Sequence, residues 1–444
     1  MLLIKNGYMI DPRSGQEGYF DLLIGDGKIE KIAAVIEPVD LLHGEAAETV
    51  QVIDAKGGIV APGLVDAHVH FRDPGFTWKE DIFTGAAAAV KGGFTTVVLM
   101  ANTKPPVDNE KTLADILEKG KRTGIHVETC ANVTMGMKGR ELTDMDRLAA
   151  AGAVGFTDDG IPLMDEAVVK QAMLKAAELQ KPLSFHEENP AFIKNNGINT
   201  WAAAEYFHLE GSDRRAEISM VQRDLELAEG TGADITIQHI STKEAVELVR
   251  QAKKTNPHIH AEAAPHHFTL TQEALKDYGT LAKMNPPLRE EADRLAIVEG
   301  LRDGTIDMIA TDHAPHSAEE KEKPITEAPS GIIGLETSLS LGIRELVNKG
   351  NLTMTQLLFK MTCAPAGLYH LPAGFLAEGG PADIVIFDPK KTWKADRFYS
   401  RSGNSPFLGE TLPGVVCYTI CGGRIVYSAA WSEDKKRAIQ KWAD

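Results

Sequence analysis

Short apolar runs alternate with longer amphipathic stretches through the middle of the chain. The apolar runs are rich in β-branched residues and predict buried strands, whereas stretches such as 84–90, followed by Gly92-Gly93, and 166–179 predict helices. A strand followed by a helix, repeated eight times, is typical of a parallel (β/α)8 barrel of the TIM type, and a mixed open sheet is the alternative. The predicted strands are Ile59–Phe71, Thr95–Met100, His126–Val133, Val154–Asp159, Leu183–Glu188, Asp234–Ile240, His258–His266 and Asp307–Thr311.

The two ends of the chain carry a different pattern, of short strands and tight turns. Runs at 2–4, 19–24 and 28–32 predict strands near the amino end, and runs at 382–387 and 424–427 predict strands near the carboxyl end. Neither end has enough apolar surface to fold alone. We therefore expect one discontinuous β domain made of residues 1–57 and 366–444, beside an α/β barrel domain of residues 58–365.

The composition limits the partners. The chain has 444 residues, 43% hydrophobic and 25% charged, as soluble globular proteins have. Its formal net charge of −16 repels nucleic-acid phosphates and anionic lipid headgroups, so we expect neither nucleic acid nor membrane as a partner. A small anionic substrate is still compatible with this charge, because a few local cations are enough to bind it. The sequence contains no phosphate-binding or dinucleotide-binding glycine motif.

The cysteines and the amino terminus indicate a cytoplasmic protein. Four cysteines are too few for a disulfide framework, which favours a reducing compartment. Cys417 and Cys421 have no second pair nearby and are interpreted as buried thiols rather than as a metal site. The first residues lack the features of an export signal, and no apolar run approaches membrane-spanning length.

His68 and His70 close the first predicted barrel strand. Residues i and i+2 of a strand point to the same side, so both imidazoles can bind one cation. A pair of buried histidines with ordinary hydrogen-bond partners fits this spacing equally well. The pair alone therefore does not decide between the two interpretations.

The carboxyl ends of the other predicted strands favour a metal site. Barrel enzymes carry their chemistry at these ends, because the following loops meet at one mouth. Four histidines and two carboxylates from five strands share this edge, which scattered core histidines do not explain. The polar residues at the strand ends are His68, His70, Arg72, Asn102, Asp158, Asp159, His186, His239, Asp312, His313 and His316.

The donor set predicts the kind of metal. Imidazole and carboxylate donors without a thiolate suit zinc, with manganese or cobalt as alternatives. Six donors exceed the three protein ligands of a typical catalytic zinc, so two metal ions sharing a bridging carboxylate are expected, with Asp159 as the bridge. Such a pair supplies a hydroxide nucleophile, and Asp312 is the predicted general base and then general acid. A plain metal-ligand role for Asp312 is compatible with this.

Arg72 and Asn102 lie on the same predicted edge, but neither is a plausible zinc ligand. Arginine grips a carboxylate through two nitrogens, so we expect a substrate that carries one. A surface arginine in a solvated loop is the alternative.

The remaining histidines are interpreted as structural. His258 and His260 also form a His-x-His pair, but no acidic partners accompany them in the sequence. The charged segment 317–330 is expected to be a solvated loop, and its place after the last strand also permits a lid. The other structural histidines are His43, His126, His208, His266, His267 and His370.

Several motifs give the chain a family resemblance. It resembles the cyclic amidohydrolases and, among them, the long bacterial dihydroorotases, over nearly its whole length. The resemblance implies a zinc-dependent barrel with a β-sandwich built from both termini, and reversible ring closure of N-carbamoyl-L-aspartate to dihydroorotate in pyrimidine synthesis. The motifs are 66–75 (DAHVHFRDPG), 92–97 (GGFTTV), 156–160 (FTDDG), 285–289 (NPPLR) and 310–316 (ATDHAPH).

The resemblance also implies roles for single residues. Asp312 corresponds to the catalytic carboxylate, and Asp159 to the acidic residue that replaces a carboxylated lysine bridge in related enzymes. A homodimer with one or two zinc ions per subunit is implied as well. The implied metal ligands are His68, His70, Asp159, His186, His239 and Asp312, and the implied substrate-binding residues are Arg72, Asn102, Asn285 and His316.

Two alternatives remain open. A sister enzyme that opens a hydantoin, dihydropyrimidine or allantoin ring resembles this chain, but such relatives place lysine at the position of Asp159 and lack the arginine at position 72. A catalytically inactive relative that serves as a structural partner of aspartate transcarbamoylase is the second alternative. Relatives of that kind have lost metal-binding histidines, which this chain keeps.

Overall fold

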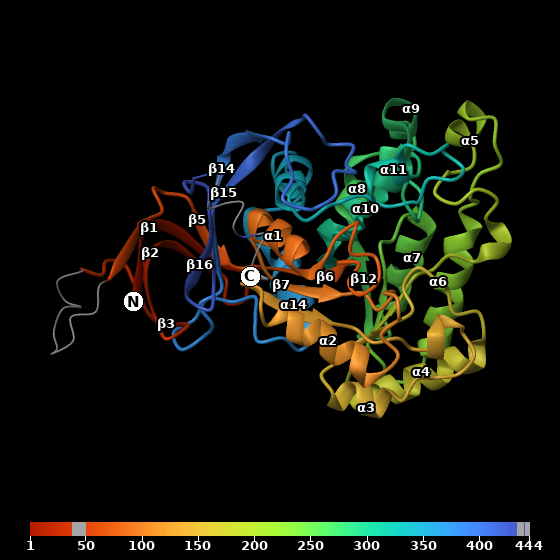
Figure 1. Ribbon diagram of the computed structural model, residues 1–444, viewed down its shortest axis with the longest axis horizontal. Coiled ribbons are helices and arrows are strands. Elements are labelled where there is room, and N and C mark those ends of the chain that lie inside the picture. Colours follow the sequence, from red (N-terminus) through yellow and green to blue (C-terminus); the bar gives the residue numbers. More distant parts are fainter. Residues whose placement is uncertain (38–49, 433–438, 440–444) are drawn as a thin grey trace.

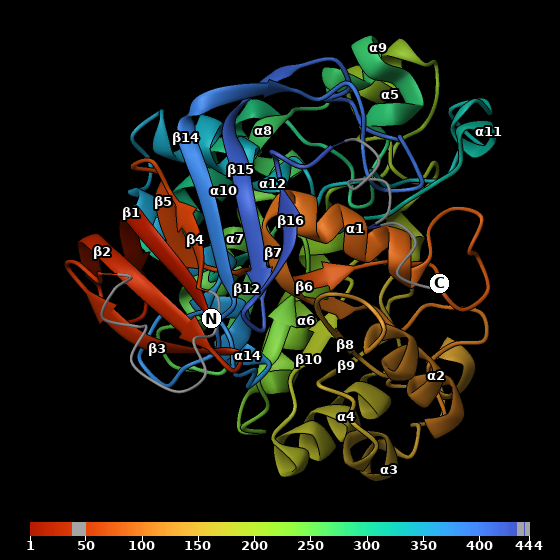
Figure 2. The same cartoon turned by 60° about the vertical axis from the view of Figure 1, so that its left-hand side comes forward.

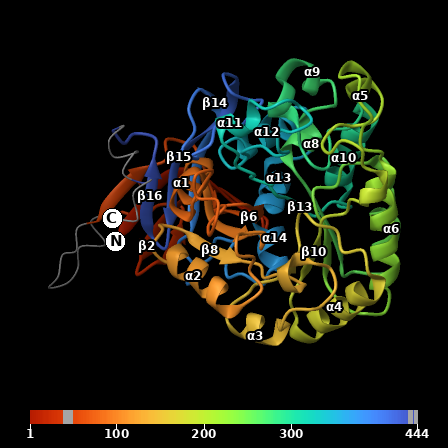
Figure 3. The same cartoon turned by 45° about the vertical axis from the view of Figure 1, so that its right-hand side comes forward.

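The computed structural model describes residues 1–37, 50–432 and 439. Eight parallel strands form its central barrel, with helices around them (Figure 3). The strands pair as β6-β7-β8 and β9-β10-β11-β12-β13, and bridges between Ala131 and Phe156 and between Val69 and His313 join the two sheets into a ring. The predicted (β/α)8 barrel is therefore confirmed. Its strands are β6 (Leu64–Val69), β7 (Phe94–Leu99), β8 (His126–Thr129), β9 (Phe156–Thr157), β10 (Leu183–Phe185), β11 (Ile235–Ile237), β12 (Ile259–Ala263) and β13 (Met308–Ile309).

The helices cover the outside of the barrel, and two of them match the predicted stretches. The first, α1, begins after Asp81, whose side chain accepts from the Phe83 and Thr84 amides, and it ends at Gly93 with φ 92°, a conformation that favours glycine. In the described part of the chain, no helix has both the length and the apolar character that a membrane span needs. The helices are α1 (Ile82–Gly92), α2 (Glu110–Gly120), α3 (Met145–Ala150), α4 (Glu166–Leu179), α5 (Ala202–Tyr206), α6 (Arg215–Ala228), α7 (Lys243–Ala252), α8 (Pro265–Thr269), α9 (Ala274–Tyr278), α10 (Glu291–Asp303), α11 (Ala318–Lys321), α12 (Ser338–Gly342), α13 (Met354–Met361) and α14 (Cys363–Leu368).

Strands from both ends of the chain lie side by side in a second, mixed sheet (Figures 1 and 2). Its order is β16-β15-β14-β5-β1-β2-β3, and β4 pairs with β1. Leu2 and Ile24 from the amino end share one apolar cluster with Ile384 and Ile420 from the carboxyl end. The apolar residues of the two chain ends are therefore buried against each other. The strands are β1 (Leu2–Asp11), β2 (Gln16–Gly25), β3 (Lys28–Ala33), β4 (Gln51–Asp54), β5 (Ile59–Pro62), β14 (Ile384–Lys394), β15 (Thr411–Cys421) and β16 (Arg424–Ser428).

The single strand expected over 59–71 is divided at Gly63. The first part, β5, pairs with β1 and β14 in the terminal sheet, while the second part, β6, pairs with β7 in the barrel. A Cβ atom on Gly63 would lie 2.1 Å from Oγ1 of Thr95, so only glycine fits where the chain passes between the two sheets. Periodicity could not reveal this break, because both parts are apolar.

Candidate metal centre

His68 and His70 leave the carboxyl end of β6 on the same side, as the strand alternation requires. Both are buried, with 0% and 6% of their surface exposed. Their Nε2 atoms face Oδ1 of Asp312, which follows β13, at 3.6 Å and 3.1 Å. The first and last strands of the barrel therefore meet at this group of three side chains.

Asp159, which follows β9, lies between this group and two further histidines. Its Oδ2 is 3.4 Å from Nε2 of His70, and its Oδ1 is 3.5 Å from Nε2 of His68. The same Oδ1 lies 3.6 Å from Nδ1 of His186 and 3.8 Å from Nε2 of His239. One carboxylate thus faces histidines from both sides of the barrel mouth, as a bridging ligand would.

The donor atoms fit divalent metal ions. Nε2 of His68 is buried and has no hydrogen-bond partner among the described residues. Bonds of about 2.0–2.2 Å to one tetrahedral ion place neighbouring donors roughly 3.3–3.6 Å apart, and the distances found here run from 3.0 to 3.8 Å. Two groups of donor atoms that share His68 lie within 4.8 Å of one another, one with His70 and Asp312 and the other with Asp159 and His239. His186 faces the same Asp159 carboxylate.

Buried carboxylates shift the pKa values of the imidazoles that face them. Burial lowers the pKa of His68, but the charges of Glu262 and Asp159 outweigh it and raise that pKa well above its ordinary value. Burial acts in the same way on His186, where hydrogen bonds with Asp159 and Glu188 raise the pKa to about 10. Burial raises the pKa of Asp312, but the hydrogen bond from His70 and the charge of His68 lower it below the ordinary value. The carboxylates therefore favour the charged forms of His68 and His186.

Three residues of the centre have a left-handed backbone. Their φ angles are 59° for Arg72, 32° for His239 and 48° for Asp312. This region is unfavourable for residues other than glycine, and such strain gathers at functional sites because the surrounding structure enforces it. The three residues lie two or three positions after the ends of β6, β11 and β13.

A small cavity of about 160 Å³ opens beside the metal ligands, and Arg72 lines it. Nη2 of Arg72 lies 3.5 Å from Nε2 of His316, and Nζ of Lys79 lies 3.4 Å from Nδ1 of the same ring. Burial and these two cations lower the pKa of His316 below its ordinary value, so its ring is neutral. The Arg72 side of the cavity suits an anionic group, and His316 lies behind Arg72 without lining the cavity itself.

Asn102 and Asn285 line the same cavity and also contact the histidines. Oδ1 of Asn102 accepts from Nδ1 of His70 at 3.0 Å, and its Nδ2 donates to Oδ2 of Asp159 at 3.1 Å. Nδ2 of Asn285 lies 3.2 Å from Nε2 of His186, and its Oδ1 is buried without a partner among the described residues. Both amides therefore orient the predicted ligands as well as facing the cavity.

Two residues at the predicted edge turn away from it. Asp158 accepts hydrogen bonds from the amides of Val133 and Thr134, behind the loop that follows β8. His313 lies 3.4 Å from Oε2 of Glu80, and its Nδ1 accepts from the amide of Gly334. Neighbouring residues at a strand end point to opposite sides, so one of each pair points away from the cavity.

The other His-x-His pair is involved in ion pairs elsewhere. His258 Nδ1 and His260 Nε2 lie 2.9 Å and 3.3 Å from Oδ1 of Asp234, away from the barrel mouth. Burial lowers the pKa of His266 to about 4, so that this ring is a neutral residue beneath the centre. His43 lies outside the described residues.

Sequence reasoning missed two carboxylates that contact the ligands. Oε1 of Glu262 in β12 lies 2.5 Å from Nδ1 of His68, and Oε2 of Glu188 lies 3.3 Å from Nε2 of His186. Glu262 stands between Ala261 and Ala263 in a buried strand, and a charged residue in that setting is the signal that could have identified it. Each carboxylate contacts the ring nitrogen that faces away from the predicted metal, and so orients the imidazole.

The segment 317–330 is tied down beside the cavity. Nζ of Lys79 lies 2.8 Å from Oε1 of Glu320, and Nζ of Lys283 donates to the carbonyls of Ile325 and Ala328 at 2.7 Å each. Ser330, at its end, donates to Oδ1 of Asn196 at 2.7 Å. These contacts hold the segment over one side of the mouth, and its role as a lid stays a prediction.

Comparison with known proteins agrees with this geometry. The Amidohydrolase family matches residues 59–426. Dihydroorotase from Clostridioides difficile (strain 630) is 54% identical over 429 residues, which cover 97% of this chain and 100% of that protein. Dihydroorotase from Streptococcus pneumoniae serotype 4 is 52% identical over 431 residues, with the same coverage of both chains. Among solved structures, L-hydantoinase (dihydropyrimidinase) from Arthrobacter aurescens has a TM-score of 0.84 and 26% identity, and 96% of each chain is covered.

Proposed function

The chain belongs to the amidohydrolase family, and from this membership we propose that it hydrolyses the cyclic amide of (S)-dihydroorotate to N-carbamoyl-L-aspartate, and closes the ring in the reverse direction. The reaction is a step of de novo pyrimidine biosynthesis. The observation that carries the proposal is the convergence of four histidines on Asp159 beside a cavity lined by Arg72. This arrangement combines a metal centre with a cation for the carboxylate of the substrate.

We assign metal binding to the donors that surround Asp159, with zinc as the metal and one or two ions per subunit. Imidazole nitrogens and carboxylate oxygens without thiolate suit zinc. When bound, the metal acts as a Lewis acid that polarises the ring carbonyl and water. The proposed ligands are His68, His70, Asp159, His186, His239 and Asp312.

Asp312 is the proposed catalytic carboxylate. Its Oδ1 lies 3.1 Å from Nε2 of His70, at the edge of the cavity. In hydrolysis, the oxygen of water bonds to the ring carbonyl carbon, and Asp312 takes the proton that the water loses. Asp312 then gives this proton to the ring nitrogen as the carbon–nitrogen bond breaks. Ring closure moves the same proton in the opposite direction.

Arg72, Asn102, Asn285 and His316 are the proposed substrate-binding residues. The Arg72 guanidinium offers paired donors to a carboxylate, and the neutral His316 ring beside it adds no competing charge. The cavity of about 160 Å³ has room for a small ring, since one water molecule takes up about 30 Å³ of liquid.

We further propose a cytoplasmic homodimer that binds neither nucleic acid nor membranes. The net charge of −16 supports the second part of this proposal. The proposed domain division, residues 1–57 with 366–444 against 58–365, is supported by the separate apolar cluster of the terminal strands. The pairing of β5 with β1 and β14 favours moving the first boundary to Gly63.

Turnover of three cyclic amides tests the proposed function. Dihydroorotate, hydantoin and allantoin are compared at equal concentration, and dihydroorotate should have the highest kcat/KM. The structural similarity to L-hydantoinase makes hydantoin the relevant competitor. Faster opening of hydantoin or allantoin would assign the chain to a sister activity. No turnover of any ring by metal-loaded protein would favour a structural partner without catalysis.

A further inference from the structure

A third group of metal-ligating side chains lies away from the barrel mouth. His126 is the first residue of β8 in the barrel, Asp383 directly precedes β14, and Cys421 is the last residue of β15. One donor atom from each lies within 4.8 Å of the other two. The group joins the barrel to the terminal sheet and shares no residue with the two groups that contain His68.

Asp383 is held in place for this arrangement. Its Oδ1 accepts from the amide of Gly422 at 2.8 Å, and its Oδ2 lies 3.0 Å from Nε2 of His126. The carboxylate is buried, whereas about half of the His126 side chain is exposed. The imidazole is thus free to adjust its position while the carboxylate keeps its orientation.

Cys421 adds a donor that an ordinary ion pair does not need. Its side chain is buried and faces both His126 and Asp383, and its contact with the carbonyl of Thr95 is long, at 3.8 Å. Thiolate sulfur, imidazole nitrogen and carboxylate oxygen together are the donors that zinc takes in proteins. Sequence spacing could not reveal the group, because His126 and Asp383 are 257 residues apart and the three members belong to three different parts of the fold.

The distances permit one shared ion. Bonds of about 2.0–2.3 Å to a tetrahedral zinc ion separate the donors by roughly 3.3–3.8 Å. The imidazole and carboxylate atoms are now 3.0 Å apart, and all three donors lie within 4.8 Å. Shifts of less than about 1 Å bring them to that geometry, and the exposed His126 ring is able to make most of them.

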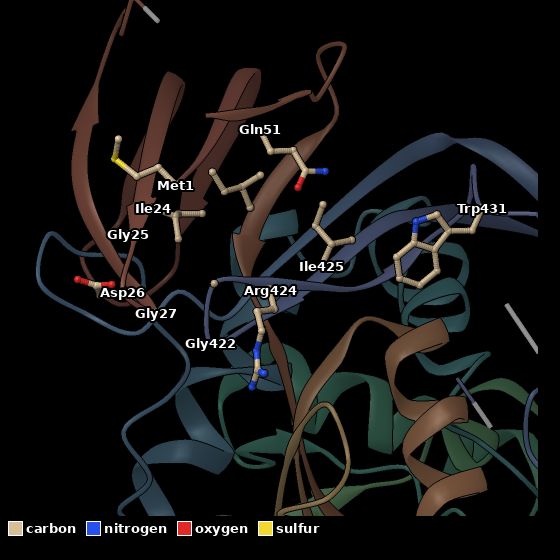
Figure 4. A pocket seen from close by; sticks show the side chains of 12 residues that line it. Met1, Ile24, Gly25, Asp26, Gly27, Gln51, Gly422, Arg424, Ile425 and Trp431 are labelled. Carbon is tan, nitrogen blue, oxygen red and sulfur yellow. The ribbon is translucent and has the colours of Figure 1, made fainter. Parts of the chain in front are cut away.

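Open space lies on both sides of the group. His126 lines one cavity of about 440 Å³, with Cys421, and another of about 360 Å³, with Asp383. Gly422 and Arg424, at the turn between β15 and β16, also line the first cavity, and Figure 4 shows them beside a third cavity on the terminal sheet. Solvent can therefore reach the group from both sides.

We propose that His126, Asp383 and Cys421 form a second metal site, which takes a Zn²⁺-class cation and leaves its fourth position to water. The ion ties β8 of the barrel to β14 and β15 of the terminal sheet. The proposal is independent of the proposed function, because none of these residues lines the cavity beside Asp159.

Cobalt substitution tests the site, because the centre around Asp159 contains no thiolate. Co²⁺-loaded protein should show a near-ultraviolet sulfur-to-cobalt charge-transfer band that Cys421→Ser and His126→Ala abolish or strongly reduce. Cys417→Ser, on the same strand and outside every metal-ligating group of the described residues, is the matched control and should keep the band. Absence of the band in the wild-type protein, or its persistence in Cys421→Ser, would overturn the proposal.

Zinc affinity gives a second readout that does not depend on the behaviour of a buried cysteine. His126→Ala changes a half-exposed side chain, so its fold should be preserved. Zinc titration in competition with a chelator should find one class of sites in the wild-type protein that this variant binds at least about tenfold more weakly. Hydrolysis of dihydroorotate should be unchanged in the variant. Equal zinc stoichiometry and affinity in both proteins would show that His126 and Asp383 form an ion pair only.

Discussion

Nδ1 of His68 lies 2.5 Å from Oε1 of Glu262, across the barrel interior from β6 to β12. The same oxygen accepts from the backbone amide of His239 at 3.3 Å. Glu262 thus orients one proposed ligand by its ring and another by its backbone, and it leaves Nε2 of His68 to face Asp159. A carboxylate behind a ligating histidine fixes the tautomer and makes the ring a stronger donor.

Glu262→Gln should weaken metal binding by about 10–100-fold, because glutamine keeps the shape of the side chain but removes its charge behind His68. The measurement is metal affinity in competition with a chelator, followed on folded protein. Glu336→Gln is the matched control, since Glu336 is also buried but accepts from the amides of Tyr399 and Ser400. Equal affinity of both variants would contradict the orienting role.

Asp312→Asn should abolish turnover in both directions while the fold persists. The amide cannot carry the proton between water and the ring nitrogen, and loss of a general acid–base group typically costs about 10²–10⁴-fold in rate. Initial rates with dihydroorotate and with N-carbamoyl-L-aspartate measure the effect, and circular dichroism checks the fold. Activity within tenfold of the wild type would show that proton transfer uses another group.

Arg72→Ala should mainly weaken substrate binding. A charge-assisted contact with a carboxylate contributes about 1.5–3 kcal/mol, which corresponds to roughly a 10- to 100-fold rise in KM for dihydroorotate. Arg215→Ala removes an exposed arginine that pairs with Asp213 on the surface, and it should leave KM unchanged. An unchanged KM in Arg72→Ala would remove the proposed contact with the carboxylate.

Glu336→Gln should make the free energy of unfolding depend less on pH. Burial raises the pKa of Glu336 from 4.5 to about 7, although the Lys91 charge and two backbone hydrogen bonds oppose this. The folded state therefore binds more protons than the unfolded state between those values, and the free energy of unfolding falls as the pH rises from 4.5 to 7. Above pH 7 the free energy of unfolding stays about 3 kcal/mol below the value it would have if the Glu336 carboxyl ionised normally.

Denaturant unfolding of both proteins from pH 4.5 to 8 measures this difference. The variant should be about as stable as the wild type at the acidic end and more stable at the alkaline end, by up to about 3 kcal/mol. A constant difference across the whole range would show that the Glu336 carboxyl ionises normally in the folded protein.

Much of the fold could be predicted because each strand and helix has its own pattern of apolar residues in the local sequence. Seven of the eight barrel strands lie within the predicted runs, β7 begins one residue before its run, and the helix predicted over 166–179 is α4 with the same bounds. The division at Gly63 could not be predicted, since β5 and β6 are equally apolar and only their partners differ. Strand partners depend on residues that are hundreds of positions away.

The candidate site was predictable as a set of strand ends, but its finer geometry was not. Asp158 and Asp159 are neighbours in sequence, and only the loop after β8 decides that the first points away from the histidines. Glu262 could not be identified from the strand ends, because it lies before the end of its strand and its contact is with His68, which is far away in the sequence. The left-handed backbone of His239 and Asp312 leaves no pattern in the sequence.

Metal content combined with turnover tests the central claim most directly. Wild-type protein as purified should contain about two or three equivalents of a divalent ion, one or two around Asp159 and one at the second site, and dihydroorotate hydrolysis should fall with metal removal by a chelator and return with added zinc. In the His126→Ala variant the same dependence should hold, which separates this centre from the second site. Full hydrolytic activity in protein stripped of metal would contradict the account.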